Sequence, residues 1–331
     1  MNITMPRYYR EFRCIAAACP DSCCKEWAVD VDPKAAAYYR SLPGALGDRL
    51  REVLIKEDGN TVMSITEGRC PMWRQDGLCR IQAELGHDAL CKTCREFPRL
   101  RHDYGDFAEL GLELSCPEAA RLIFADTGET VTETKAGGEA AEYDTELMAT
   151  LLRSRQEILS YLETATTPLP QKLAVILLHA HSVQAEIDGG ETAVFDADAC
   201  LNDALRFAGK GDMDLLFAFF RELEILTERW KKRLSEKTEM GVLDGRYLPL
   251  VRYFIRRYWL QAIADYDLVC RVKFIIGAVL LIWALGGDLI STAQLFSKEI
   301  ENDSDNVDAV LDSAYTQPAL TDANLLGLLL Q

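Results

Sequence analysis

The sequence lacks a long hydrophobic run and any excess of positive charge. Its longest apolar run, Phe274–Leu285, is shorter than the roughly 20 residues that cross a bilayer, which favours a buried helix and no membrane span. The net charge of −16 argues against electrostatic binding to nucleic acid or to an anionic membrane surface, because both need clustered Lys and Arg. The same charge is compatible with a basic partner, such as a protein that presents lysines.

An export signal is also missing from the N-terminal residues. The segment MNITMPRYYREFRC is polar and has no apolar stretch of the kind that a secretory signal contains. We therefore expect a cytoplasmic protein, in which thiols stay reduced and clustered cysteines are typical metal ligands. The four histidines form no HExxH motif, so the sequence offers no zinc-enzyme pair of that type.

Cysteine is the abundant feature of the first third of the chain. Nine of the eleven cysteines lie within the first 116 residues, and four of these fall within the stretch CIAAACPDSCC that ends at Cys24. Cys91 and Cys94 have the spacing of a metal knuckle, and Cys79 follows a turn at Gly77. Such spacing predicts a metal or iron–sulfur site. The adjacent thiols of Cys23 and Cys24 disfavour one simple tetrahedral zinc, because consecutive side chains usually point apart.

The hydrophobic pattern divides the chain into two unlike parts. Residues 1–125 read as short helices and strands around the cysteines, a small irregular α+β module that binds a metal or cluster. Residues 126–144 are polar and contain glycine, so we predict a linker there. Residues 145–331 repeat apolar positions at steps of three and four, which predicts an all-α helical bundle. The expected fold class is therefore mainly α.

Several phrases around the cysteines resemble the flagellin lysine N-methylase family. They are the Cys-Cys pair followed by Trp27, the Cys-Pro pair at Cys70, GLCRI at 77–81 and LCKTCREFPR at 90–99. The resemblance covers roughly residues 7–120. The cysteine core is also similar to that of a wider group of small zinc- or iron-chelating proteins with a CxxxCxxCC-type motif.

The resemblance implies methyl transfer from S-adenosylmethionine to lysines of flagellin, with an iron–sulfur cluster, four-iron in type, held by cysteines. Zinc is the alternative metal. Carried onto this chain, the resemblance implies four ligands out of the nine N-terminal cysteines. Our ranked choice is Cys19, Cys23, Cys79 and Cys94, followed by Cys24, Cys70 and Cys91.

The usual signs of a methyl-donor site are absent from this chain. No GxGxxG fingerprint is present, and the Cys19-x3-Cys23 spacing departs from the CxxxCxxC of radical enzymes at the next cysteine. The residues alone assign no catalytic or donor-binding side chain and no oligomeric state. An alternative therefore stays open, in which the metal only stabilises a non-catalytic module that binds a protein partner.

Overall fold

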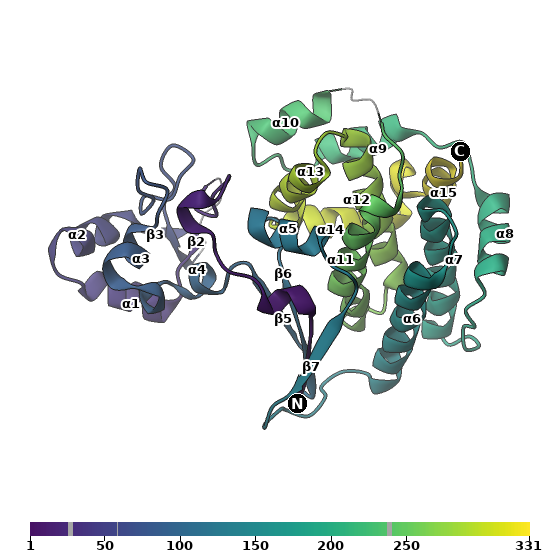
Figure 1. Cartoon of the computed structure of the whole chain (residues 1–331), viewed down its shortest axis with the longest axis horizontal. Helices are drawn as coiled ribbons and strands as arrows, with labels where there is room; N and C mark the ends of the chain where they lie inside the picture. Colours follow the sequence, from purple (N-terminus) through teal and green to yellow (C-terminus); the bar gives the residue numbers. More distant parts are fainter. Residues whose placement is uncertain (26–28, 58, 237–239) are drawn as a thin grey trace.

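A computed structural model describes residues 1–25, 29–57, 59–236 and 240–331. The described chain has two parts, a small lobe of residues 14–98 and a larger body formed by the rest (Figure 1). Helices dominate both parts and the strands form two small sheets. The predicted class, mainly α, is confirmed.

The small lobe has a hydrophobic cluster of its own. Leu50 and Tyr39 are fully buried in it, and Cys70 and Cys91 are buried beside them. Its sheet has the strand order β2-β4-β3 with antiparallel pairing throughout. The elements of the lobe are β2 (Val29–Asp30), α1 (Pro33–Ser41), α2 (Gly44–Val53), β3 (Leu54–Glu57), β4 (Asn60–Met63), α3 (Arg80–Leu85) and α4 (Lys92–Glu96).

One aspartate joins two helices of the lobe. Asp32 caps α1, as its position before Pro33 predicts, and its Oδ1 accepts a hydrogen bond from the Ala35 N–H at 3.0 Å. Its Oδ2 accepts from the Lys92 N–H at 2.8 Å, at the first residue of α4. Asp32 therefore fixes the start of α1 against the start of α4.

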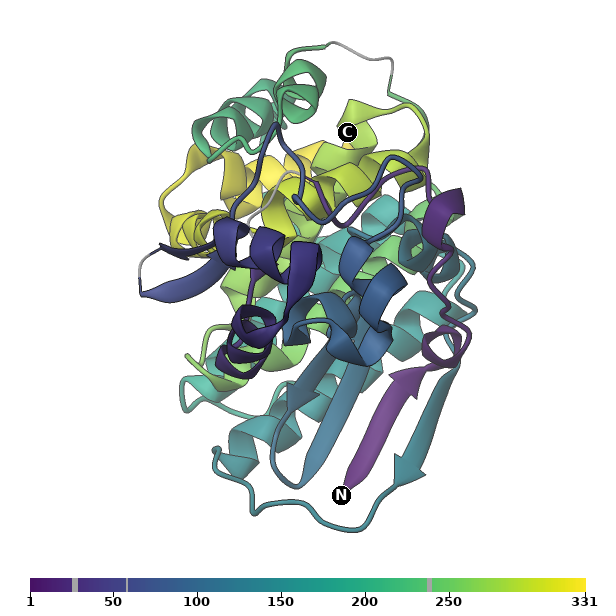
Figure 2. The same ribbon diagram turned by 90° about the vertical axis from the view of Figure 1, so that its left-hand side faces the viewer.

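A four-stranded sheet forms the side of the body next to the small lobe (Figure 1). Its strand order is β5-β6-β1-β7, and β1 pairs in parallel with β6, from Asn2 opposite Phe107 to Thr4 opposite Glu109. The other two pairings are antiparallel. Figure 2 shows these strands side by side below the small lobe. The elements are β1 (Asn2–Pro6), β5 (Arg99–Asp103), β6 (Phe107–Leu112) and β7 (Thr130–Thr134).

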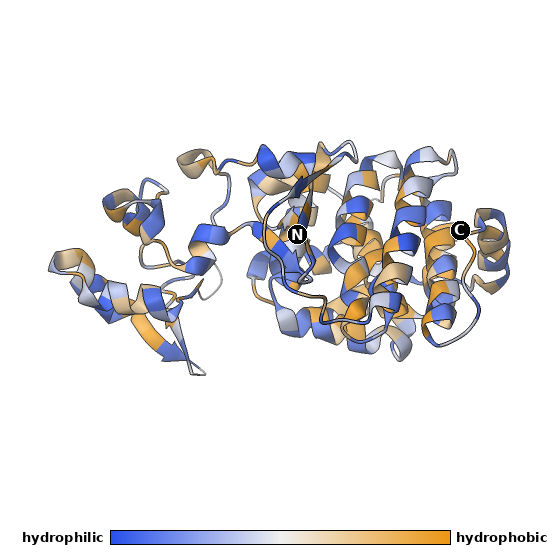
Figure 3. Ribbon diagram, turned by 90° about the horizontal axis from the view of Figure 1, so that it is seen from below, coloured by the Kyte–Doolittle hydropathy of each residue, from blue (hydrophilic) through white to orange (hydrophobic). Residues whose placement is uncertain are grey.

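Helices fill the rest of the body. In Figure 3 the most apolar stretches gather inside it, and one large cluster joins the sheet side of the body to its helices. The helices are α5 (Pro117–Phe124), α6 (Thr145–Thr164), α7 (Leu169–Ile187), α8 (Ala197–Phe207), α9 (Met213–Glu222), α10 (Glu228–Ser235), α11 (Leu248–Tyr258), α12 (Leu268–Leu285), α13 (Leu289–Phe296), a π-helix (Ser297–Glu301), α14 (Ser304–Asp312) and α15 (Asp322–Leu330).

The long apolar run of the sequence forms α12, the centre of the body. Among the described residues, α12 has the length and composition that could cross a membrane, yet 94% of that window is buried inside the protein. Asp267 caps its start by accepting from the Cys270 N–H. The predicted buried helix is therefore present, and its apolar side chains contact other helices.

The hydrophobic clusters of the structure do not follow the predicted boundaries between module, linker and helical bundle. Residues 99–125, placed by composition with the cysteines, contribute Leu112, Leu114 and Ile123 to the core of the body. Part of the predicted linker forms β7, which pairs with β1 over five residues. The reason is that residues 2–6 and 107–112 share one sheet, so the small lobe is an insertion between β1 and β5. The limits of independently folding domains stay a prediction.

Replacement of Asp32 by alanine tests its role as the joint between α1 and α4. The change removes a helix cap and a second hydrogen bond, so we expect the free energy of unfolding to fall by about 1–2 kcal/mol. Urea unfolding measures this loss, and hydrogen exchange at the first turns of α1 and α4 should become faster. Asp30→Ala removes the same charge from an exposed position on β2 and serves as the control. Equal effects of the two changes would contradict the assignment.

Candidate functional site

The cysteines predicted as ligands lie on loops and helix starts of the small lobe. Cys79 and Cys91 stand immediately before α3 and α4, and Cys94 lies within α4. Cys19 follows a short helical turn at Ala16–Ala18. The loops of the lobe, rather than its helices or strands, therefore decide where the thiols point.

Each of the seven thiols interacts with at least one other. Hydrogen bonds join three pairs, which are Cys23 with Cys24, Cys24 with Cys70, and Cys91 with Cys94. The bond between Cys91 and Cys94, together with burial, raises the pKa of Cys94, whereas the same bond lowers the pKa of Cys91. Charge interactions connect Cys79 to this group. Segments far apart in the sequence thus bring their thiols into one region of the lobe.

Cys14, Cys19 and Cys116 interact with other thiols, whereas Cys200 and Cys270 lie in helices of the body. Burial is the largest cause that raises the pKa of Cys19, and the thiols of Cys14 and Cys23 add to it. Cys116, at the start of α5, interacts with Cys19 and Cys23. Cys200 and Cys270 lie in α8 and α12, away from the small lobe; Cys270 is buried and Cys200 is half-buried.

Cysteine thiols are the right kind of ligand for an iron–sulfur cluster, but the described side chains are not gathered around one point. Thiolate sulfur is the ligand of such clusters, and four separate segments contribute it here. Among the described residues, however, no three His, Cys, Asp or Glu side chains are grouped so that they could hold a metal ion. The ligand choice therefore stays a proposal, and we derive no chemical step through a cluster.

An aspartate connects the cysteine stretch to the body. Asp21, within CIAAACPDSCC, forms an ion pair with Lys298 at 3.0 Å and accepts a hydrogen bond from Gln294 at 3.2 Å. Lys298 belongs to the π-helix and Gln294 to α13. Gln294 also donates to the Ser115 carbonyl at 2.7 Å. These contacts hold the first cysteine loop against the helical body.

Two aromatic residues near the cysteine phrases make ring contacts. Tyr104 stacks on Phe107 with ring centres 4.7 Å apart, and Trp73 carries the Arg69 guanidinium on its face at 4.1 Å. Trp27 lies outside the described residues. None of these contacts assigns a catalytic role.

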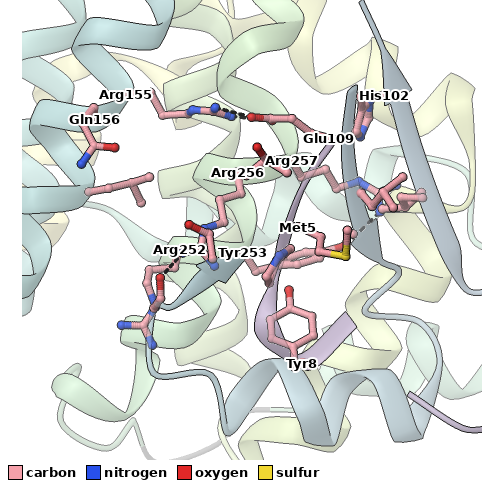
Figure 4. A pocket seen from close by; sticks show the side chains of 18 of the residues that line it. Met5, Tyr8, His102, Glu109, Arg155, Gln156, Arg252, Tyr253, Arg256 and Arg257 are labelled. Atoms are coloured by element: carbon pink, nitrogen blue, oxygen red, sulfur yellow. Dashed lines mark hydrogen bonds and ion pairs between the residues drawn. The ribbon is translucent and has the colours of Figure 1, made fainter. Parts of the chain in front are cut away.

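The body contains a cavity of about 460 Å³ between its sheet and two helices. A cavity of this size is typical of small-molecule sites. One face of α6 lines it at steps of three and four, from Leu152 through Arg155 to Glu163. Glu109 and Gly111 face it from β6, since alternate residues of a strand share a face. Figure 4 shows side chains of the residues that line the cavity.

Four arginines line the cavity, and each one has a carboxylate partner. Arg155 donates two hydrogen bonds to Glu109, at 2.8 and 2.5 Å. The other pairs are Arg252 with Glu163 at 2.6 Å, Arg256 with Asp126 at 3.1 Å, and Arg257 with Glu301 at 3.1 Å. The cavity wall thus presents two complete ion pairs, Arg155 with Glu109 and Arg252 with Glu163, whereas the partners of Arg256 and Arg257 lie outside its lining.

The loop before β7 closes one end of the cavity. Arg252 donates to the Asp126 carbonyl, and Arg256 donates to the Gly128 carbonyl at 2.6 Å. Gly128 has φ +91°, and a Cβ there would lie 3.1 Å from Glu163 Oε1. The backbone conformation therefore favours glycine, and a Cβ would crowd the end of the Glu163 side chain.

Glu301 is the buried anchor behind the cavity. Its side chain is fully buried and accepts hydrogen bonds from the Tyr253 hydroxyl at 3.1 Å and the Tyr258 hydroxyl at 2.9 Å, besides the ion pair with Arg257. Tyr253 in turn accepts from the Leu114 N–H at 3.3 Å. This network fixes α11 against the π-helix and holds Arg257 at the cavity wall.

Two buried polar atoms of the cavity wall, His102 Nε2 and Arg252 Nε, have no hydrogen-bond partner within the described protein. His102 Nε2, on β5, is buried and makes no hydrogen bond within the described protein. Burial lowers the pKa of His102, so the imidazole is neutral at neutral pH and can donate or accept one hydrogen bond. An unsatisfied buried atom that faces a cavity indicates a bound molecule or an ordered water.

The sequence alone did not predict this cavity. A signal was present in RYFIRRY on α11, where three arginines interrupt an otherwise apolar helix. Arginine in a buried helix needs partners, and here the arginines themselves line a cavity while their carboxylate partners surround it. Their distribution over β6, α6 and the loop at residues 126–128 could not be seen from spacing along the chain.

Comparison with known proteins gives three similar chains from Salmonella. The flagellar biosynthetic protein FliU of Salmonella muenchen is 32% identical over 133 residues, which cover 38% of this chain and 79% of that protein. Lysine-N-methylases of Salmonella typhimurium and Salmonella choleraesuis are 32% and 33% identical over 133 residues, which cover 33% of each. No protein-family model matches the chain. No solved structure matches it either.

The extent of the match to FliU decides the class of protein. This chain belongs to the flagellin lysine N-methylase family, as the cysteine phrases predicted. The matched region spans only a third of the length of the two lysine-N-methylases.

Removal of Arg257 tests the buried network behind the cavity. Arg257→Met leaves the Glu301 carboxylate buried without its ion-pair partner, so we expect unfolding to become easier by about 3–5 kcal/mol. The double variant Arg257→Met with Glu301→Gln removes the uncompensated charge and should recover part of that loss. Urea unfolding of the wild type, both single variants and the double variant measures the coupling. Strictly additive effects would show that the two groups do not interact.

Proposed function

We propose that this chain is a protein-lysine N-methyltransferase that acts on flagellin, with S-adenosylmethionine as the methyl donor and a cysteine-bound iron–sulfur cluster. The observation that carries the proposal is the similarity to FliU over most of its length, supported by the two relatives named lysine-N-methylase. Because the match covers a third of those two relatives, activity, donor and substrate are all part of the proposal.

The reaction sets clear chemical requirements. A neutral lysine amine attacks the methyl carbon of the donor, a new N–C bond forms, and the S–C bond breaks. The sulfonium becomes a thioether and the methylated amine releases a proton. The site must therefore lower the pKa of the lysine by desolvation or supply a base.

The charge of the chain supports a lysine-bearing substrate. The net charge of −16 attracts a basic protein surface and speeds its approach. At the cavity, Glu163 has 42% of its side chain exposed, which leaves its carboxylate able to attract an incoming ammonium group. These features support the proposed substrate class without selecting a particular lysine.

The proposed cluster would be held by four of the lobe cysteines, with Cys19, Cys23, Cys79 and Cys94 as our first choice. Support comes from the thiol chemistry and from the interactions between the segments. When bound, a cluster supplies redox or structural chemistry to the small lobe. The protein contributes the ion pair between Asp21 and Lys298, which holds the lobe against the body.

A methyl-transfer assay on flagellin tests the proposed activity. Full-length protein purified without oxygen is incubated with flagellin and labelled S-adenosylmethionine, and we expect label on lysine residues. Flagellin whose lysines are chemically blocked should receive none. Metal and sulfide analysis of the same sample should find iron with sulfide, whereas colourless protein with stoichiometric zinc and no transfer would favour the metal-stabilised binding module.

Cys94→Ser tests the proposed ligand set. Loss of a ligand should remove the metal and the activity together, because cluster binding needs all of its thiolates. Cys270→Ser is the matched control, since Cys270 is buried in α12 of the body, and it should keep both properties nearly intact. Retention of the full metal content by the Cys94 variant would show that this ligand choice is wrong.

A further inference from the structure

We propose that the cavity between the sheet and helices α6 and α11 is the binding site of the methyl donor. This inference rests on the proposed methyltransferase function and gives its donor a place, which neither the relatives nor the sequence motifs assign. The site lies in the body, lined from β1, β5, β6, α6 and α11, and the cysteines proposed as ligands lie in the small lobe. The donor site is therefore separate from the thiols.

The charges of the wall select the kind of ligand. Each of the four arginines is paired with a carboxylate, so the described wall offers no unpaired cluster of cations for a polyphosphate. A wall that presents guanidinium and carboxylate groups side by side fits a ligand that carries an anion and a cation together. The amino-acid head group of S-adenosylmethionine has a carboxylate and an ammonium on the same carbon.

The rest of the lining fits the remainder of the donor. Met5, Leu100 and Leu159 provide apolar surface beside the charged pairs, which suits a flat aromatic base. Carboxylates such as Glu109 attract a positively charged sulfonium. Figure 4 places Glu109 and Arg155 on one side of the cavity and Arg252 on the opposite side, so a ligand that spans the cavity meets both charged ends.

Two buried nitrogens of the wall lack hydrogen-bond partners within the described protein. They are His102 Nε2 and Arg252 Nε, and the latter has only an ionic contact of 3.5 Å with Asp126. Leaving such groups unsatisfied is costly, and a ligand with several polar atoms would satisfy them. The depth of the site agrees, because Arg252 and Tyr253 are 4% and 5% exposed on the floor whereas Leu152 is 37% exposed at the rim.

Gly111 provides a way to block the cavity without removing any charge. It lies in β6 on the same face as Glu109, and a Cβ there would meet only Leu100, at 3.9 Å. A side chain is therefore tolerated at this position, and its outer atoms would occupy the cavity. Replacing glycine in a strand also favours the folded state.

The test compares Gly111→Leu with Gly111→Ala in the full-length protein. Binding of S-adenosylhomocysteine, the stable product of the donor, is measured by calorimetry, and the KM for S-adenosylmethionine is measured on flagellin. We expect the leucine variant to bind about tenfold more weakly or worse, with a melting temperature equal to or above that of the wild type. The alanine variant adds one methyl group and should bind within about threefold of the wild type.

His102→Leu provides an independent test with a matched control. Because His102 Nε2 has no partner within the described protein, removing the imidazole should leave stability unchanged while weakening S-adenosylhomocysteine binding about tenfold. His87→Leu changes an exposed histidine of the small lobe and should alter neither property.

The possible outcomes separate this inference from the proposed function. If the wild type binds the product and methylates flagellin while all four variants bind normally, the cavity is not the donor site and the methyltransferase function stands. If the wild type neither binds the product nor transfers methyl groups, the proposed function fails and the donor site fails with it. Weaker binding confined to Gly111→Leu and His102→Leu supports the cavity as the donor site.

Discussion

The parallel pairing of β1 with β6 is the constraint on which the rest of the structure depends. It brings residues 2–4 beside residues 107–109, so the segment between β1 and β5 must leave the sheet and return to it. The small lobe is the result, an insertion between β1 and β5. The same pairing places Glu109 where α6 can reach it with Arg155, and it thereby builds one wall of the cavity.

Local rules predicted much of the secondary structure. Asp32 before Pro33 caps α1, Pro98 lies just after the end of α4, and the predicted apolar run at 274–285 forms most of α12. These features depend on neighbours in sequence, such as caps, proline and helical periodicity. A structure that depends on such signals can be predicted without knowledge of the tertiary fold.

The division of the chain and the cavity could not be predicted in this way. Composition grouped residues 99–125 with the cysteines, but the strands at 99–112 belong to a sheet that also contains the N-terminal strand β1. Likewise, Arg155, Glu109 and Arg256 come from three elements, and nothing in their spacing shows that they meet. The cysteine phrases predicted the family because that information is carried by short contiguous motifs, whereas convergence of the thiols depends on loop conformation.

The insertion of the lobe has a consequence for the order in which the molecule folds. A chain synthesised from its N-terminus exposes β1 first, but β1 cannot find β6 until the residues up to Leu112 have emerged. Closing so long a loop is slow when the loop is disordered. If the lobe folds first around its own hydrophobic cluster, it holds its first and last residues in place. The disordered chain that must close between β1 and β6 is then short. The thiols of the lobe are then brought together before the cavity exists.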